Sequence, residues 1–490
     1  MNKIKPILFI VFCAFWACTS QRPQNAIQTD KLPNIFPAYY GTTIPFNIAP
    51  LNFKTEEVAS RIFVSIEGKN GKLEKSFDGN KTDWPINDWS DFLNTNKGDS
   101  IFVSVFTFNN DQWNVFKPIG YFVSADPIDD YLFYRLIEPG YQSWNKMGLY
   151  QRQLRSFEET TILDNKIMAH SCMNCHTLSA NNPENMVFHI RGNNSGTIII
   201  KDGKVKKLES KKPTKFKSVS FPSWHPSNKF IAFSINKIRQ MFPSHGSERA
   251  HAFDMGSDMV IYNVEKEEYF TSPLIYADDA FEAFPCFSPD GKSLYFISAP
   301  AAPMPQEIKD IQYSLCRIDF DPETATLGNK VDTLISPAKT RKSLTMPRIS
   351  PDGKYILITM SDYGNFPAYN EEADLYLYGV KDSSLIRLDA VNSNQVESYH
   401  SWSSNGHWIV VSSRRLDGLF MNAYIAHIDE NGIADKPFLL PQEDPDFYKS
   451  FLFSFNLPEF SIAKVPVSPN QIEKAAKQST TEPSMIETTH

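Results

Sequence analysis

Four segments of this 490-residue chain repeat one pattern of strand, tight turn and strand. They cover residues 221–233, 284–296, 346–358 and 399–411. The second and third turn at Ser-Pro-Asp-Gly-Lys, whose Asp-Gly pair supplies the positive φ that a tight hairpin needs. Trp224, Phe287, Ile349 and Trp402 hold the same place in the pattern and lie 63, 62 and 53 residues apart. A unit that recurs at this spacing predicts a repeat architecture, with Asp290 and Asp352 as turn residues.

A second strand pair follows each repeat, so one unit holds four strands. Four strands at a steady period are typical of a propeller blade. A fifth unit, which lacks the Ser-Pro-Asp-Gly-Lys turn but has its own hairpin at residues 201–204, lies at residues 186–208. Residues 451–460 are expected to close the ring by pairing with the first blade. The sequence therefore predicts an all-β chain with a β-propeller over residues 186–466.

The most specific chemical motif precedes these repeats and reads Cys172-Met173-Asn174-Cys175-His176. Two thiols three residues apart can bond covalently to the two vinyl groups of one haem, and the adjacent imidazole can ligate the iron. The motif predicts one covalent c-type haem held by Cys172 and Cys175, with His176 on the iron. Met186 and His189 are the candidates for the sixth ligand.

Three other interpretations of the motif stay open. The two cysteines can form a disulfide in an oxidising compartment. They can bind zinc together with two of His170, His176 and His189. They can form a redox-active pair, although no thioredoxin-like unit surrounds them. Cys286 and Cys316 lie in apolar strand patterns and are expected to be buried thiols.

The first 18 residues have the features of an export signal. Lys3 and Lys5 precede an apolar run over residues 7–17, which is too short for a helix that spans a bilayer. The run ends at Ala17-Cys18, which resembles the bacterial lipoprotein cleavage site and implies a lipid on Cys18. The mature chain is then expected outside the cytoplasm, anchored on the periplasmic face of a membrane.

The remaining parts of the chain are assigned from local patterns. Residues 19–39 are expected to be a linker, and residues 40–125 a small immunoglobulin-like β-sandwich of short β-branched and aromatic runs. Residues 126–185 form a connector in which Asp126-Pro127 is expected to open a short helix that ends near Ile137. The polar residues 467–490 are expected to be a disordered tail.

The repeats resemble the TolB-like propeller family, whose ring is usually six-bladed. The order of sandwich, CxxCH connector and propeller resembles exported lipoproteins of Bacteroidetes that are often labelled cytochrome c biosynthesis or TolB-like proteins. That resemblance implies a fold and an envelope location, and it is weak for function.

The function expected from these features is electron transfer or redox sensing, with a protein partner docked on the loop face of the propeller. One alternative is a non-redox binding or scaffold propeller in which the two cysteines are structural. Another is a lyase-type propeller enzyme that binds a metal through His245 and His251. The sequence contains no nucleophile elbow, phosphate loop or HExxH motif, so a classical enzyme is not expected. The net charge of −7, with scattered basic residues, argues against a nucleic-acid partner.

Overall fold

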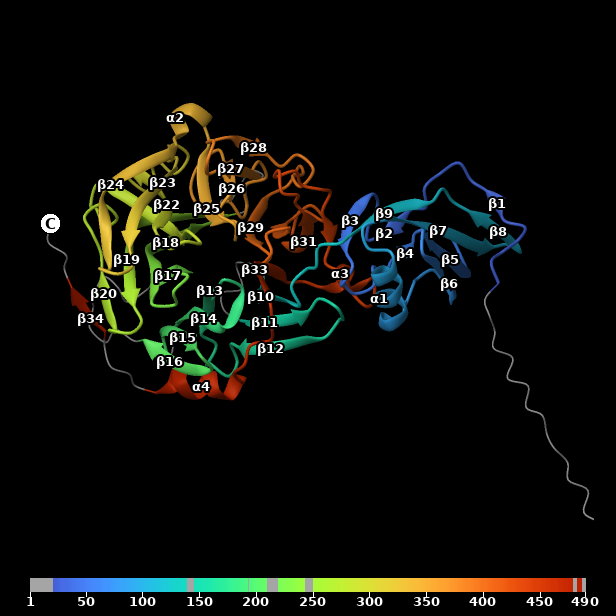
Figure 1. Ribbon diagram of the computed structural model, residues 1–490, viewed down its shortest axis with the longest axis horizontal. Coiled ribbons are helices and arrows are strands. Elements are labelled where there is room, and N and C mark those ends of the chain that lie inside the picture. The colour runs from blue at the N-terminus through green and yellow to red at the C-terminus, as the bar shows by residue number, and fades with distance from the viewer. Residues whose placement is uncertain are drawn as a thin grey trace, which may run out of the picture.

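A computed structural model describes residues 21–138, 145–192, 194–208, 219–242, 250–478 and 483–486. The chain forms a larger ring of sheets and a smaller domain beside it, built from the N-terminal residues (Figure 1). Cys18, the expected lipidation site, lies outside the described residues. No helix within the described ranges is long and apolar enough to cross a membrane.

The ring is a six-bladed β-propeller, as the described strands show, and the all-β fold class is confirmed. Each blade is an antiparallel sheet whose first strand lies near the centre of the ring (Figure 1). From the inside outward, blade 1 is β33 (Ser454–Ser461), β10 (Tyr131–Ile137), β11 (Met147–Gln153) and β12 (Glu159–Asp164). Blade 2 is β13 (Cys172–Ser179), β14 (Asn182–Arg191), β15 (Gly196–Lys201) and β16 (Lys204–Leu208). Blade 3 is β17 (Val219–Trp224), β18 (Phe230–Met241), β19 (His251–Asn263) and β20 (Glu268–Phe270).

The second half of the ring follows the same order. Blade 4 is β21 (Ala280–Phe287), β22 (Ser293–Pro300), β23 (Ser314–Asp321) and β24 (Thr326–Ile335). Blade 5 is β25 (Ser343–Ile349), β26 (Tyr355–Ser361), β27 (Asp374–Gly379) and β28 (Leu385–Arg387). Blade 6 is β29 (Glu397–Trp402), β30 (Trp408–Ser413), β31 (Asn422–His427) and β32 (Phe438–Leu439). The short helices α2 (Pro337–Thr340) and α3 (Phe447–Ser450) lie between strands.

Blade 1 closes the ring by joining the two ends of the propeller segment. Its inner strand, β33, comes from the C-terminal side and pairs with β10, so the expected closure by this stretch is confirmed. The propeller begins at β10, which means that the predicted start at residue 186 is too late. The predicted helix that ends near Ile137 is also wrong. Residues 131–137 are largely buried on both faces as a strand between two neighbours, and this packing overrides the local Asp-Pro signal.

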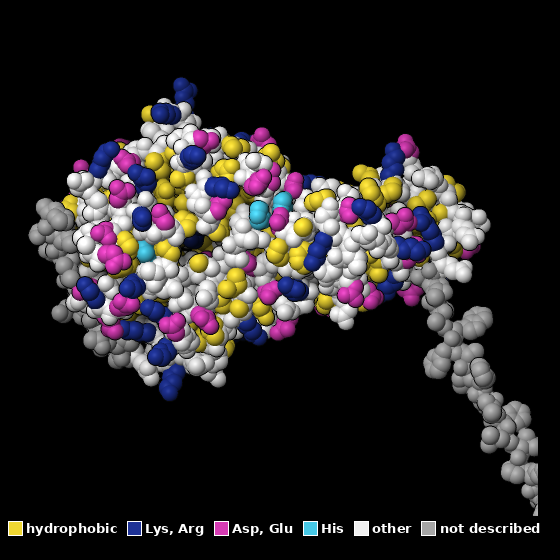
Figure 2. Space-filling model, in the orientation of Figure 1, with side chains coloured by type: hydrophobic (Ala, Val, Ile, Leu, Met, Phe, Trp, Pro, Cys, Tyr) yellow, Lys and Arg dark blue, Asp and Glu magenta, His cyan; other side chains and the backbone are white. Residues whose placement is uncertain are grey.

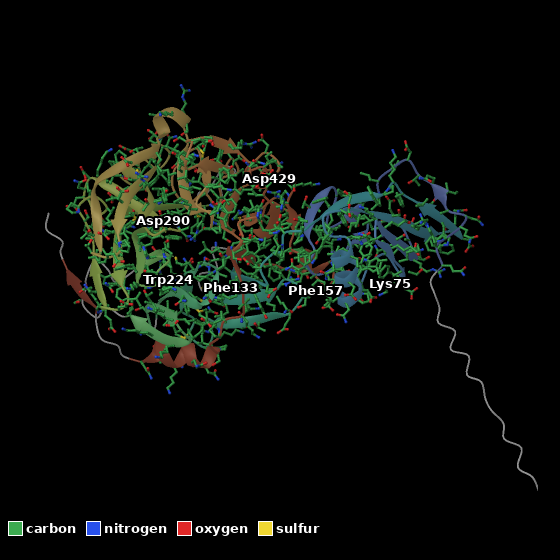
Figure 3. All side chains as sticks on the ribbon, in the orientation of Figure 1. Lys75, Phe133, Phe157, Trp224, Asp290 and Asp429 are labelled. Atoms are coloured by element: carbon green, nitrogen blue, oxygen red, sulfur yellow. The ribbon has the colours of Figure 1, made fainter. Side chains whose placement is uncertain are left out.

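The turns between the first and second strands of the blades link neighbouring blades, as blades 3 and 4 show. In blade 4, Asp290 accepts hydrogen bonds from the Ser288 hydroxyl at 2.5 Å and the Lys292 amide at 3.0 Å, so its role as a turn residue is confirmed. The His225 imidazole of blade 3 lies 2.9 Å from the Gly291 carbonyl oxygen in the same turn. Trp224 and Asp290 mark these neighbouring turns in Figure 3. Cys286 and Cys316 are buried free thiols, as expected.

The N-terminal domain has a seven-stranded sheet, a separate two-stranded sheet and one helix. The order of the larger sheet is β1-β8-β7-β5-β6, with β3 and β9 paired beside β7, and the separate pair is β2 and β4. The elements are β1 (Ile27–Gln28), β2 (Ile35–Phe36), β3 (Thr42–Pro45), β4 (Lys54–Thr55), β5 (Arg61–Gly68), β6 (Gly71–Asp78), α1 (Ile86–Thr95), β7 (Ser100–Asn109), β8 (Gln112–Val115) and β9 (Ile119–Ser124). Two face-to-face sheets of an immunoglobulin-like sandwich are not confirmed.

Residues 21–39 belong to this domain and are not a linker. Ile35 and Tyr39 are buried, and Tyr39 donates a hydrogen bond to the Leu439 carbonyl oxygen of the propeller at 3.3 Å. Lys54 forms an ion pair with Asp446 at 2.8 Å across the same junction. One hydrophobic core runs from the N-terminal domain into blades 5 and 6. The two parts of the chain therefore share a packed interface.

The C-terminal residues were expected to be disordered, but their first half is ordered. Helix α4 (Pro469–Lys477) begins at a capping box formed by Ser468 and Gln471. Ile472 and Ala476 are fully buried against blades 1 and 2. Farther on, β34 (Ser484–Ile486) pairs in parallel with β20 at the outer edge of blade 3. The polar composition led to the prediction of disorder. The two buried residues, Ile472 and Ala476, are nevertheless spaced four apart, as on one face of a helix.

Candidate functional site

The six inner strands share one irregularity, a β-bulge of two residues opposite one. Its first residue has a positive φ, between 44° and 57°, in every blade. In chain order the bulges are Cys175-His176, Phe221-Pro222, Phe284-Pro285, Met346-Pro347, Tyr399-His400 and Leu457-Pro458. Proline has no N–H to donate, so it suits a position where ladder pairing is interrupted. The bulges place equivalent side chains around the axis of the ring.

The CxxCH motif lies on β13, and its last two residues are the bulge of blade 2. His176 therefore occupies the position held by proline in four blades and by His400 in blade 6. The segment Cys-His-Thr-Leu-Ser-Ala-Asn from Cys175 corresponds to Tyr-His-Ser-Trp-Ser-Ser-Asn from Tyr399. The motif is thus part of the propeller repeat, which the expected connector over residues 126–185 did not anticipate.

Both flanks of the motif are fastened to blade 1. Arg135 of β10 donates a hydrogen bond to the Met173 carbonyl oxygen at 3.2 Å. The Glu459 carboxylate of β33 accepts hydrogen bonds from the Thr177 hydroxyl at 3.0 Å and the Leu178 amide at 3.2 Å. These bonds join the closing blade to the blade that follows it.

In this arrangement the motif does not fit a haem. Cys172, Cys175 and His176 are only 6%, 1% and 3% exposed, and neighbouring blades cover them. Covalent attachment needs both thiols at the edge of a macrocycle and the imidazole on its face, which would require β13 to leave its blade. Haem attachment at these three residues stays a prediction.

The other partners proposed for the motif do not converge on it either. Met186 is paired with Leu178 in the sheet and is fully buried in the blade core. His189 lies 3.0 Å from the Thr197 hydroxyl through its Nδ1 atom. His170 is exposed, and the two motif cysteines are free thiols, so no disulfide joins them. The described structure brings neither a sixth haem ligand nor a zinc ligand set together here.

A narrow cavity of about 20 Å³ lies on the axis of the ring. Its walls are the bulge residues of blades 3 to 6, together with Leu457 and Arg348. The rings of Phe221 and Phe284 are 4.3 Å apart, centroid to centroid, and Phe366 packs against both. A cavity this narrow admits a group of about the size of a water molecule, such as the polar end of a larger ligand.

Arg348 provides the positive charge of this cavity. Among the described residues, none forms a hydrogen bond or ion pair with its guanidinium group. Burial lowers the pKa of both His176 and His400 to about 3, and the nearby arginines add to this effect, so both imidazoles are neutral. Burial also raises the pKa of Glu459 to about 7, against the opposing effect of Arg348. Below a pH of about 7 the Glu459 carboxyl is mostly protonated, so it balances little of the positive charge of Arg348.

The segment between β18 and β19 contains His245 and leads to His251, the two residues expected to bind a metal in a lyase-type enzyme. His245 and Arg249 lie outside the described residues, whereas His251 and Asp254 are on β19. Asp254 accepts hydrogen bonds from Asn236 at 2.9 Å and Asn365 at 2.7 Å, and burial raises its pKa to about 7. His251 lies 3.4 Å from the Tyr363 hydroxyl. In the described part of the chain these residues do not form a metal-binding group.

Comparisons with protein-family models and with curated proteins find no match. Solved structures give distant likenesses. A DUF4784 family protein from Bacteroides caccae is 10% identical, covers 84% of this chain and 96% of its own, and has a TM-score of 0.32. A puromycin-hydrolyzing peptidase of Mycobacterium tuberculosis is 11% identical, covers 82% and 57%, and has a TM-score of 0.38. Prolyl oligopeptidase B from Galerina marginata is 10% identical, with a TM-score of 0.33, and this chain spans 42% of its length. These values are too low to carry an argument about function.

Proposed function

We propose that this protein is a ligand-binding propeller whose narrow axial cavity takes the charged end of a small organic anion, with the aromatic or otherwise apolar body of the anion at its mouth. The observation that supports this function is that Arg348, Phe221 and Phe284 line the same axial cavity. A guanidinium group binds a carboxylate through charge-assisted hydrogen bonds, and the rings offer apolar area to the rest of the ligand.

The cysteines of the CxxCH motif have a structural role in this proposal. Cys175 occupies the bulge position of Phe221, Phe284 and Tyr399, and burial raises the pKa of its thiol. A neutral buried thiol behaves as a small apolar side chain. The motif then shapes one side of the ring axis and carries no redox chemistry.

Benzoate and benzamide are a matched pair of probes for the cavity, because they have similar size and differ in charge. We expect the full-length protein to bind benzoate roughly 10- to 100-fold more tightly than benzamide, the range of a hydrogen bond to a charged group. Arg348→Gln should abolish the preference and Arg348→Lys should keep part of it. Binding is measured by ligand-observed NMR titration.

Arg155→Gln is the control for this experiment, since Arg155 pairs with Asp130 on the surface. It should leave the preference for benzoate unchanged. Equal affinity for the two probes, or a preference that survives Arg348→Gln, would contradict the proposed function.

We also propose the envelope location that the first residues imply, with a TolB-like propeller carried on a lipid anchor at Cys18. Cys18→Ala should move the expressed protein from the membrane fraction to the soluble fraction and remove its labelling by a radioactive fatty acid. Cys286→Ala, which changes a buried thiol in blade 4, should leave both unchanged. Membrane association that is the same in the Cys18 variant would exclude this anchor.

A further inference from the structure

A second cluster of titratable side chains lies where the N-terminal domain meets blade 6. It consists of Asp126, His407 and His427, and one donor atom from each lies within 4.8 Å of those of the other two. Asp126 follows β9 on the segment that leads into the propeller, His407 is in the turn between β29 and β30, and His427 ends β31. Figure 2 shows histidine side chains beside acidic ones at this junction, on the surface of the molecule.

The hydrogen bonds around His427 leave one interaction that a neutral imidazole does not satisfy. Its Nε2 atom lies 2.9 Å from Asp126 Oδ2, and its Nδ1 atom lies 3.3 Å from Asp435 Oδ2. A neutral imidazole has one N–H, so it can donate to only one of the two carboxylates. The second contact requires either an additional proton or a metal cation between nitrogen and carboxylate.

The geometry favours a metal at Nε2. Asp435 is placed to accept the Nδ1–H and so fix the tautomer that exposes the Nε2 lone pair toward Asp126, which is the usual carboxylate–histidine–metal arrangement. The His407 ring lies alongside, with its centroid 6.2 Å from that of His427 and an interplanar angle of 15°. His407 therefore offers a second imidazole nitrogen as a metal ligand. A protonated His427 that pairs with its two carboxylates would not need this second imidazole.

We propose that Asp126, His407 and His427 bind one zinc ion at the junction of the N-terminal domain and the propeller. Two imidazoles and one carboxylate are a common donor set for zinc, with a fourth position left for water. Donors at about 2.0–2.1 Å from zinc are about 3.4 Å apart, so small side-chain rotations bring these three into place. This site is independent of the axial cavity.

The surroundings of the site give the metal a structural role. The Asn405 side chain donates a hydrogen bond to the Pro127 carbonyl oxygen at 2.7 Å, and the Ser404 amide donates to Asp129 at 2.8 Å. The β29–β30 turn is thus already bonded to the segment that carries Asp126. Zinc would fasten that segment to the β29–β30 turn and to β31 of blade 6 and fix the angle between the domains.

Zinc binding is tested on the full-length protein after removal of metals with EDTA. Equilibrium dialysis against zinc chloride, followed by elemental analysis, should find one zinc per chain. His407→Ala should lose it, and Asp435→Asn should weaken it roughly 10- to 100-fold, as expected for a group that orients a ligand. Asp130→Asn removes a carboxylate from the same segment outside the cluster and should bind zinc like the unaltered protein.

The thiols of β13 are the other groups that can bind zinc. Two measurements distinguish binding at these thiols from binding at the junction. The Cys172→Ser/Cys175→Ser variant should retain the zinc, and the cobalt-substituted protein should lack the intense near-ultraviolet band of thiolate ligands. Zinc should also slow hydrogen exchange of residues 125–130, and only when His407 is present. No bound zinc, or zinc that survives His407→Ala, would overturn the proposal.

Discussion

Glu459→Ala is expected to lower the free energy of unfolding by about 2–4 kcal/mol. The substitution leaves the Thr177 hydroxyl and the Leu178 amide without their acceptor, and both residues are buried. A buried donor without a partner costs about 1–3 kcal/mol. Urea denaturation followed by circular dichroism measures the loss, and a variant as stable as the unaltered protein would show that this carboxylate does not hold the ring closed.

Glu459→Gln is the matched variant, because the amide oxygen can still accept both hydrogen bonds. It also tests the pKa of about 7. A carboxyl whose pKa is raised on folding, from 4.5 in the unfolded chain, makes a contribution that is complete below pH 4.5 and is lost as pH rises to about 7. The loss amounts to roughly 3 kcal/mol at about 1.4 kcal/mol per pKa unit. Gln should remove that part of the pH dependence.

Ile472→Ala is expected to lower the free energy of unfolding by about 2–5 kcal/mol, the range for deleting a buried aliphatic side chain. Ile472 is fully buried between α4 and the outer strands of blades 1 and 2. The midpoint of urea denaturation should fall accordingly. Lys474→Ala, at an exposed position of the same helix, should change it little. Equal effects of the two substitutions would mean that α4 is not docked on the propeller.

The propeller could be predicted because each blade carries its own local signals. The Asp-Gly turns at Asp290 and Asp352 and the even spacing of Trp224, Phe287 and Ile349 specify hairpins without reference to the rest of the chain. Blade 1 could not be predicted in this way, because it is assembled from two distant segments and lacks the turn pattern. The helix predicted after Pro127 failed for the same reason, since the burial of 131–137 depends on a strand more than 300 residues away.

Only part of the candidate site could be predicted from the sequence. The bulge pairs Phe-Pro, Phe-Pro and Met-Pro were visible in the repeats, and aligning Cys175-His176 with Tyr399-His400 would have placed the motif in a blade. Arg348 follows the Met-Pro pair and could have been found in that alignment. Glu459 could not, because only closure of the ring brings it to Thr177. The junction residues share no motif, because Asp126 lies about 280 and 300 residues before His407 and His427.

The claim on which the rest depends is that Cys175 and His176 form the inner-strand bulge of blade 2, with Cys172 earlier on the same strand. The most direct test is co-expression of the full-length protein with a cytochrome c maturation system, followed by haem staining of a denaturing gel and a pyridine haemochrome spectrum. We expect a colourless protein whose Cys172→Ser/Cys175→Ser variant keeps the same β-sheet circular dichroism. A covalent haem that is lost in the double variant would contradict it and show that β13 leaves the propeller to hold the cofactor.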